Sequence, residues 1–357
     1  MDIANLTFIV TDDCNFRCSY CFQSREKQTI DNGTIKTAVD FFYPFLKGAG
    51  RVDIGFYGGE PLLAFARIEY AVRLLEEKNR RGHKQIEYNV TTNGSRLNTG
   101  MLDFFNDHCF NLTLSFDGLA QEKCRQPGSF SKTLASIKDI QAFPGIRLDI
   151  NSVFSPLTVP DLSASLLFII DQAGPEVGFS LALKPGWRPG DFQVLEAELA
   201  RLSDFLLVYY RQHGRVPVRN FRVSRPGTGP FRCHAGREHI AITPAGKLWG
   251  CFLFHDYFKT REHDRQYRDY AFGTLDDFVT GYERRYPQTQ AHYLELRQEL
   301  FCVGSDPCFL CPDIGDCLVC PVNAAYAGGA IGQVSRDQCR LSRIQGAARR
   351  NFLTSIS

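Results

Sequence analysis

The chain has 357 residues, and its hydrophobic fraction of 44% is enough for a sizeable core in roughly two or three domains. Net charge is only +2, from 41 basic and 39 acidic residues, without long runs of one sign. This balance disfavours a nucleic-acid or membrane partner. The N-terminal sequence MDIANLTFIV lacks the features of a signal peptide, and no apolar stretch is long enough to span a membrane, so we expect a cytoplasmic protein.

Short apolar runs alternate with helical patterns through the first half of the chain. Strands are expected at 6–10, 52–57, 86–91, 111–116, 148–154 and 178–183, with helices between them, for example at 34–46, 62–78 and 132–142. Such alternation favours parallel strands joined by right-handed crossovers. Six units fit into about 180 residues, whereas a closed eight-unit barrel needs about 250. We therefore predict an α/β fold, an open (β/α)6 partial TIM barrel in a domain at 1–185.

The second half of the chain has a different character. Residues 186–232 contain Pro/Gly-rich borders around a helical pattern at 192–210, which predicts a bridging region. Cysteines are dense from Cys233 onward, and we expect a small cysteine-rich α+β domain at 233–357. Within it, IAITPAGKLWGCF predicts a β-hairpin, and residues 339–352 predict a basic helix.

Three cysteines, Cys14, Cys18 and Cys21, directly follow the first predicted strand, at the end where barrels of this kind carry their chemistry. In a reducing compartment, metal ligation explains the chain's 13 cysteines better than disulfides do. Four thiolates usually close a metal site, but three on a [4Fe–4S] cluster leave one iron open. The alternative is a zinc knuckle with a distant fourth ligand, for which the spacing C-x3-C-x2-C is unusual.

The segment CNFRCSYC, with Tyr20 before the last cysteine, resembles the C-x3-C-x-aromatic-C motif of the radical S-adenosylmethionine (SAM) superfamily. YGGEPLL, after the second strand, resembles the family's GGEP motif, which holds the amino group of SAM. Two glycines permit close approach, a glutamate accepts from an ammonium group, and a proline suits a first helical turn. The resemblance thus implies SAM-binding roles for Tyr20, Gly58, Gly59, Glu60 and Pro61.

Two later segments, TTNGSRL after the third strand and LSFDG after the fourth, resemble family segments that line the SAM pocket. Ser, Asn, Asp and Gly are common in any turn after a strand, so each segment alone is weak evidence. The signal is their order, with one such segment after each successive strand. The SAM-binding residues implied in these segments are Thr92, Asn93, Ser115 and Asp117. The resemblance further implies Asn151, on the fifth strand, and the backbone near Leu181, on the sixth, which would meet the adenine. Arg125 is either a partner of the SAM carboxylate or a surface arginine.

The resemblance also implies the mechanism. SAM binds the open iron, one electron splits its C–S bond, and the resulting 5′-deoxyadenosyl radical takes a hydrogen atom from the substrate. An external one-electron reductant of the flavodoxin or ferredoxin type is then required. No residue is assigned as the catalytic acid or base.

The second cysteine field resembles the SPASM extension of radical SAM peptide-modifying enzymes, which holds two auxiliary [4Fe–4S] clusters. Its middle block ends C-x5-C-x2-C, where the family has C-x5-C-x3-C. The implied ligands are Cys233, Cys251 and Cys320 for auxiliary cluster I, and Cys308, Cys311, Cys317 and Cys339 for auxiliary cluster II.

Two complete auxiliary clusters need eight thiolates, and this pattern supplies seven. Cys302 is the candidate for the eighth, in cluster I; otherwise cluster I is three-coordinate, and Cys302 is a buried small hydrophobe. We interpret Cys109 and Cys124 as buried small hydrophobes too. A pair of zinc ribbons is the alternative for the whole field.

The resemblance implies a maturase that forms a thioether or C–C crosslink in a ribosomally made peptide (a RiPP), with auxiliary clusters accepting an electron. Formylglycine formation in a sulfatase is the alternative, but the relatives that do this carry an aspartate where this chain has Phe252. Modification of a small molecule is a third option, and a non-catalytic electron carrier is the alternative from a different class.

An open barrel gives a peptide or protein substrate lateral entry, and strand addition at an exposed edge is one way to hold it. Because the first strand begins within the first ten residues, we expect no N-terminal leader-recognition domain. That role then falls to a separate leader-recognition protein, or to none.

Overall fold

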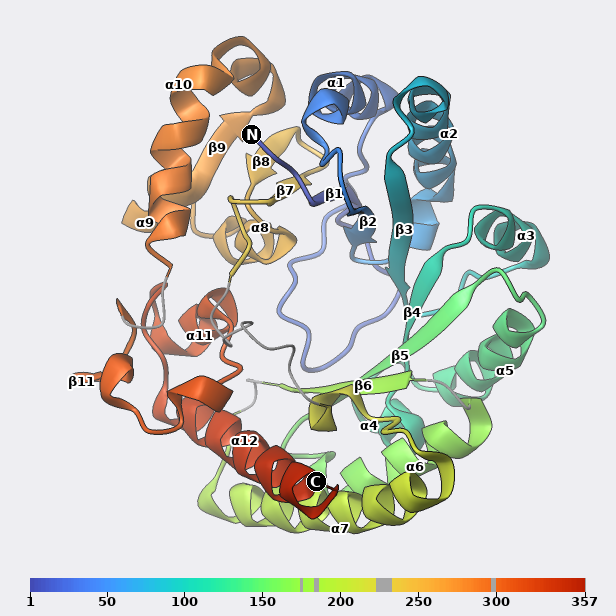
Figure 1. Cartoon of the computed structure of the whole chain (residues 1–357), viewed down its shortest axis with the longest axis vertical. Coiled ribbons are helices and arrows are strands. Elements are labelled where there is room, and N and C mark those ends of the chain that lie inside the picture. Colours follow the sequence, from blue (N-terminus) through green and yellow to red (C-terminus); the bar gives the residue numbers. More distant parts are fainter. Residues whose placement is uncertain (174–175, 183–185, 223–232, 297–299, 357) are drawn as a thin grey trace.

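The computed structural model describes residues 1–173, 176–182, 186–222, 233–296 and 300–356. Strands form a curved wall in the middle of the molecule, and helices cover its outer side (Figure 1). The first six strands are β1 (Asn5–Thr11), β2 (Arg51–Gly58), β3 (Gln85–Thr92), β4 (Asn111–Ser115), β5 (Arg147–Phe154) and β6 (Glu176–Leu181). They lie in sequence order, and each neighbouring pair is parallel. The predicted six-stranded parallel wall is therefore confirmed, apart from residue 183, which lies outside the described residues.

The helices between these strands follow from their apolar spacing. α2, for example, buries Ile68, Ala71, Val72 and Leu75, which lie on one face of a helix. α1 begins where the Asp31 side chain accepts a hydrogen bond from a backbone N–H of the first turn. The helices of the wall are α1 (Asn32–Phe42), α2 (Phe65–Gly82), α3 (Thr99–Asp107), α4 (Gln121–Cys124), α5 (Ser129–Gln141), α6 (Leu162–Ala173) and α7 (Pro189–His213).

The C-terminal part of the chain extends the same sheet, which the sequence did not predict. The expected hairpin is present as β7 (His239–Ile242) and β8 (Lys247–Trp249), and β9 (Ala271–Thr274) pairs with β8. β7 pairs in parallel with β1, so that the sheet has nine strands. The edge of β1 is thus covered along this pairing and is closed to an added peptide strand.

The opposite edge of the wall is also covered in part. The N–H of Val177 in β6 donates to the carbonyl oxygen of Pro217 at 3.0 Å. The Asn220 side chain bonds both the N–H and the carbonyl oxygen of Phe179, each at 2.9 Å. A peptide would have to displace these groups to add a strand here, so the expected route of strand addition has no free backbone at these two residues.

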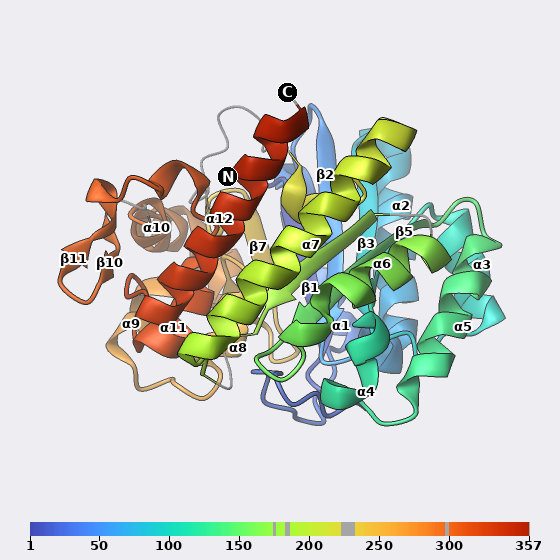
Figure 2. The same ribbon diagram turned by 90° about the horizontal axis from the view of Figure 1, so that it is seen from below.

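The last helices return to the barrel. α12 (Arg336–Ile356) lies along α7 (Figure 2). The ring of its Phe352 also lies 5.5 Å from the ring of Phe221, in the short helix η5 (Arg219–Phe221). The remaining elements are α8 (Phe252–Phe258), α9 (Arg265–Tyr270), α10 (Leu275–Leu294), β10 (Cys302–Val303), β11 (Asp306–Pro307) and α11 (Pro321–Gly328). Of the predicted bridge at 186–232, residues 223–232 lie outside the described residues, and the domain limits stay predictions. In the described chain, no helix combines the length and apolar character needed to cross a membrane.

Candidate active site

The cysteine loop, residues 12–28, leaves the C-terminal end of β1 and packs against the end of β2. The Gly59 N–H donates to the Thr11 carbonyl oxygen at 3.0 Å. A Cβ atom on Gly58 would lie 2.2 Å from that same oxygen, and one on Gly59 would lie 2.3 Å from the carbonyl oxygen of Asp13. Both positions therefore require glycine, because a side chain would push the cysteine loop away from the sheet.

The three thiols of this loop share one environment. Burial raises the pKa of Cys14 to about 11, and the charges of Cys18 and Cys21 contribute to the rise. Burial likewise raises the pKa of the other two thiols. Thiolates grouped in this way repel one another unless a cation neutralises them, and a coordinating metal centre deprotonates its thiols outright. The donor set fits the three-thiolate side of an iron–sulfur cluster.

Glu60 is a buried carboxylate at the end of β2, only 1% exposed. Oε1 accepts hydrogen bonds from the hydroxyl of Thr92 at 2.6 Å and from the N–H of Leu62 at 3.0 Å, and Oε2 accepts from the N–H of Asn93 at 2.7 Å. Burial raises the pKa of this carboxyl, and the hydrogen bonds oppose the rise. The ends of β2 and β3 thus fix the orientation of the glutamate.

A cavity of about 460 Å³ joins the cysteine loop to the ends of the strands. The predicted site residues that line it are Cys14, Cys18, Tyr20, Cys21, Gly58, Gly59, Glu60, Thr92, Asn93, Ser115, Asn151 and Leu181. Pro61 and Asp117 are absent from this lining. Pro61 instead begins the short helix η2 (Pro61–Ala64), which follows Glu60.

Asp117 has a different position from the one expected. It is fully buried, and its carboxylate holds the guanidinium of Arg125 through two hydrogen bonds of 2.7 and 2.9 Å. It also accepts from the hydroxyl of Tyr20 and the N–H of Val153, each at 2.8 Å. Asp117 therefore lies behind the cavity and positions its neighbours, whereas Arg125 lines the cavity and is buried, not a surface arginine.

Aromatic residues that the sequence analysis did not single out complete the cavity. Phe252, which follows Cys251, stacks on Tyr57 with ring centroids 3.9 Å apart. Phe22, next to Cys21, packs on Tyr326 of α11 at 4.8 Å. Each contact joins residues more than 190 positions apart, and no local pattern reveals such pairs. The C-terminal part of the chain therefore supplies part of the wall of the site.

Asp256 is a second carboxylate that the sequence analysis missed. It lies one turn after Phe252 in α8 and is 8% exposed. Its Oδ2 accepts from the side-chain amide of Gln23 at 3.2 Å, and the same amide donates to the hydroxyl of Tyr57 at 3.1 Å. Burial raises the pKa of Asp256 to about 6. A lone acid inside the apolar stretch FLFHDYF is the sequence signal that could have found it.

The raised pKa of Asp256 predicts a pH-dependent gain in stability for Asp256→Asn. Because the folded-state pKa is about 6 and the reference value is 3.8, the group favours folding at low pH, and that contribution is lost as the pH rises through about 6. Above pH 6 the variant should therefore be more stable than the wild type, by up to about 3 kcal/mol at 1.36 kcal/mol per pKa unit.

Anaerobic urea unfolding of both proteins at pH 5 and pH 8 measures this difference. Asp276→Asn, at an exposed position, serves as the control and should show little change at either pH. An equal effect of Asp256→Asn at the two pH values would contradict the prediction.

The second cysteine field separates into two groups. Cys233, Cys251 and Cys320 form the first, since the charges of the other two thiols act on Cys251. Burial raises the pKa of all three thiols, and backbone N–H groups that donate to the sulfur atoms oppose the rise. These three thiols fit one side of an iron–sulfur cluster as the loop thiols do.

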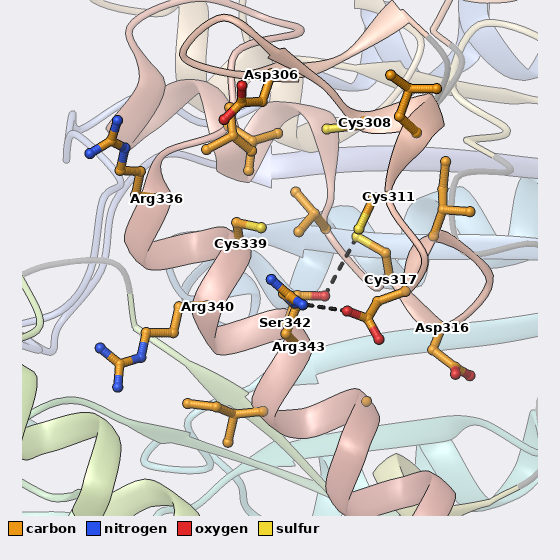
Figure 3. A pocket seen from close by; sticks show the side chains of 18 of the residues that line it. Asp306, Cys308, Cys311, Asp316, Cys317, Arg336, Cys339, Arg340, Ser342 and Arg343 are labelled. Atoms are coloured by element: carbon orange, nitrogen blue, oxygen red, sulfur yellow. Dashed lines mark hydrogen bonds and ion pairs between the residues drawn. The ribbon is translucent and has the colours of Figure 1, made fainter.

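The second group lines another cavity, of about 790 Å³, between α12 and the loops before it (Figure 3). Its thiols are Cys308, Cys311, Cys317 and Cys339. Among the described residues, no three His, Cys, Asp or Glu side chains converge as tightly as they would around a single metal ion. The four-thiol set matches the ligand number of a complete [4Fe–4S] cluster.

Cys302 lies with this second group, and its expected place in the first group needs correction. β10 pairs with β11 so that Cys302 lies opposite Pro307, directly before Cys308. The charge of Cys302 accordingly acts on the Cys308 thiol. Of the two cysteines expected to be buried, Cys124 is buried, whereas Cys109 is exposed.

Comparison with known proteins places this arrangement in a family. A sequence model of the Radical SAM superfamily matches residues 8–150. GTP 3',8-cyclase of Helicobacter pylori is 31% identical over 275 residues, which are 71% of this chain and 81% of that protein. The uncharacterized protein MJ0907 of Methanocaldococcus jannaschii is 27% identical over 186 residues, 51% of this chain. The chain spans 63% of MJ0907 and 47% of the GTP 3',8-cyclase of Rhizobium etli.

Solved structures share the fold over a greater length. The chain superposes on anSMEcpe with bound AdoMet at a TM-score of 0.77 and 16% identity, over 99% of this chain and 95% of that one. It superposes on Streptococcus suis SuiB bound to precursor peptide SuiA at a TM-score of 0.62 and 14% identity, over 95% and 76%. The domain match and the 31% identity to the Helicobacter relative over most of its length show that this chain belongs to the radical SAM superfamily.

Proposed function

We propose that the protein is a radical SAM peptide maturase that forms a thioether or C–C crosslink in a ribosomally made peptide. The observation that carries this proposal is the cavity in which the loop thiols and Glu60 meet Phe252 and Tyr326, aromatic residues from the cysteine-rich part of the chain. Phe252 directly follows Cys251, so this cavity lies close to the first thiol group of the second field. Such an arrangement suits a reaction in which the substrate loses both a hydrogen atom and an electron.

A [4Fe–4S] cluster and SAM would together supply the 5′-deoxyadenosyl radical at this site. Cys14, Cys18 and Cys21 would hold the cluster, and Glu60, held by three hydrogen bonds, would accept the ammonium group of SAM. Arg125 offers its guanidinium to an anionic group in the cavity. The aromatic pairs would keep water away from the substrate C–H bond and fix its position.

The two thiol groups of the second field would hold auxiliary clusters that take up the electron. The first group has three described thiols, so its fourth position would be open, and the second has four, with Cys302 beside them. The structures of anSMEcpe with AdoMet and a peptide, which share this fold at a TM-score of 0.75, support a peptide or protein substrate. A flavodoxin- or ferredoxin-type reductant and a separate leader-recognition protein belong to the same proposal.

Formylglycine formation is less well supported than crosslinking. At position 252, where the relatives that perform it have an acid, this chain has a phenylalanine stacked on Tyr57. That position has no group that accepts a proton, and the carboxylate of Asp256 lies one turn further along α8.

Modification of a small molecule is the second candidate, and one observation favours it. GTP 3',8-cyclase of Helicobacter pylori is one relative with 31% identity over most of its length. A nucleotide substrate would use Arg125 and Arg219, which line the cavity.

The test is an anaerobic assay of reconstituted protein with SAM, dithionite and peptides encoded by short reading frames beside the gene. The expected result is peptide-dependent 5′-deoxyadenosine together with a peptide that has lost two hydrogen atoms, located by fragmentation in the mass spectrometer. GTP is supplied in a parallel reaction. Consumption of GTP without peptide modification would favour the second candidate, and absence of 5′-deoxyadenosine under every condition would refute an enzymatic role.

A further inference from the structure

Helix α12 is fastened to the loop that carries Cys311 and Cys317. Arg343 Nε lies 2.7 Å from Asp313 Oδ2, and Arg349 Nη2 lies 2.7 Å from Asp316 Oδ1. Arg350 contacts both aspartates, at 3.1 and 2.6 Å. Several ion pairs on two acids define the position of the helix better than an isolated surface pair would. The face of α12 toward the cavity is therefore fixed relative to the thiols (Figure 3).

Ser342 lies on this fixed face beside Cys317 (Figure 3). The N–H of Leu318 donates to Ser342 Oγ at 3.1 Å, and Ser342 Oγ lies 3.5 Å from Cys317 Sγ. Because a backbone N–H only donates, the serine oxygen is the acceptor in the first contact, and its own hydrogen remains available for the sulfur. Ser342 is 7% exposed, so bulk water competes little for that hydrogen.

We propose that Ser342 is a positioning residue whose O–H···S hydrogen bond to Cys317 raises the reduction potential of the cluster that the second thiol group would hold. This inference rests on the proposed function, because it requires that group to bind an iron–sulfur cluster. Hydrogen bonds to ligand sulfur atoms stabilise the more negative, reduced state of a cluster, and they are among the features that set its potential.

The second thiol group lies in loops that are exposed at the surface of the molecule. Phe309, Leu310 and Leu318, in the loops that carry the thiols, are 53%, 70% and 47% exposed. The second thiol group therefore lies near the surface, where a soluble electron carrier can approach. For each crosslink the substrate gives up one hydrogen atom to the radical, one proton and one electron. A raised potential would hold that electron at this surface site until a carrier removes it.

The test is a redox titration of the anaerobic full-length holoprotein, followed by electron paramagnetic resonance. We expect Ser342→Ala to lower the ratio of reduced to oxidised cluster at a fixed potential by about tenfold. This corresponds to a midpoint lower by about 59 mV for a one-electron couple. The midpoint potential should change for only one of the clusters seen by electron paramagnetic resonance. Ser342→Thr, which keeps the hydroxyl, should retain most of the wild-type midpoint.

Ser335→Ala is the matched control. Ser335 precedes α12, and its hydroxyl accepts from the N–H of Gln338 at 3.2 Å, so its loss perturbs the same helix without touching a sulfur atom among the contacts of the described residues. The midpoint potentials of the clusters in Ser335→Ala should equal those in the wild type. Should Ser342→Ala lose iron, Ser342→Cys keeps the volume with a weaker donor, and its midpoint should shift in the same direction.

The outcomes separate this inference from the proposed function. Unchanged midpoints in Ser342→Ala with full iron content would overturn the inference alone, as would an equal shift in Ser335→Ala. Wild-type protein with only the iron of the SAM site would instead refute the auxiliary clusters and, with them, this inference. The variant Cys317→Ser identifies the signal, because it should lose the signal that Ser342→Ala shifts.

Discussion

Replacing Cys14, Cys18 and Cys21 together with serine is expected to reduce SAM cleavage to the level of a protein-free control. Serine is close to cysteine in size, so the loop can keep its packing against β2, where the fixed contacts involve Gly58 and Gly59. A serine hydroxyl, however, does not supply the thiolate that iron–sulfur clusters require. The structure therefore predicts loss of chemistry without loss of fold.

The measurement is 5′-deoxyadenosine formed from SAM and dithionite under anaerobic conditions, with iron counted per chain. About four irons should be lost, because the cysteines of the second field are unchanged. Cys109→Ser, at an exposed cysteine, is the control and should keep both activity and iron. Retained cleavage in the triple variant, or zinc in place of iron in the wild type, would contradict the cluster assignment.

Replacing Asp117 with alanine is expected to destabilise the fold strongly. The carboxylate accepts two hydrogen bonds from the buried guanidinium of Arg125 and one from the hydroxyl of Tyr20. Removing one partner of a buried ion pair leaves an uncompensated charge and typically costs about 3–5 kcal/mol. Urea unfolding should show a loss of this size, and SAM binding should weaken because both neighbours line the cavity.

Two further variants check the cause of this loss. The double variant Asp117→Ala/Arg125→Met removes the orphaned charge and should recover part of the lost stability. Asp161→Ala removes an acid paired with Lys123 at the surface, at 2.6 Å, and should cost less than about 1 kcal/mol. If the double variant proves no more stable than Asp117→Ala, the unpaired charge is not the reason for the loss.

The strands and the motif residues that line the cavity follow from local sequence. The alternation of β2, which buries Val52, Ile54 and Phe56, has the period of a half-buried strand, and the structure contains that strand. Cys14 to Cys21 and the residues around Glu60 were identified by motif, and the structure brings them to one cavity. These features depend on residues close together in the chain or on their order along it.

The differences involve contacts that are set by packing in the folded chain and that no sequence pattern announces. Asp117 looked like a cavity residue because it follows a strand, but the carboxylate is occupied by Arg125, and no pattern announces a buried pair of this kind. Cys302 was assigned to the first thiol group because two complete clusters need eight thiolates and the pattern supplied seven. The pairing of β10 with β11 instead places it opposite Pro307, directly before Cys308. The contact of Phe252 with Tyr57 depends on how α8 packs, which periodicity does not encode.

The parallel pairing of β7 with β1 has a consequence for synthesis of the chain. Asn5 lies opposite His239, so one edge of the first strand waits for a partner that leaves the ribosome 234 residues later. At a translation rate of roughly 5–20 residues per second, that interval is about 12–47 s. During this time the hydrophobic edge of β1 is an open template for pairing with other nascent chains. Slower elongation or lower temperature should therefore change the yield of soluble protein mainly through events before residue 239 has emerged.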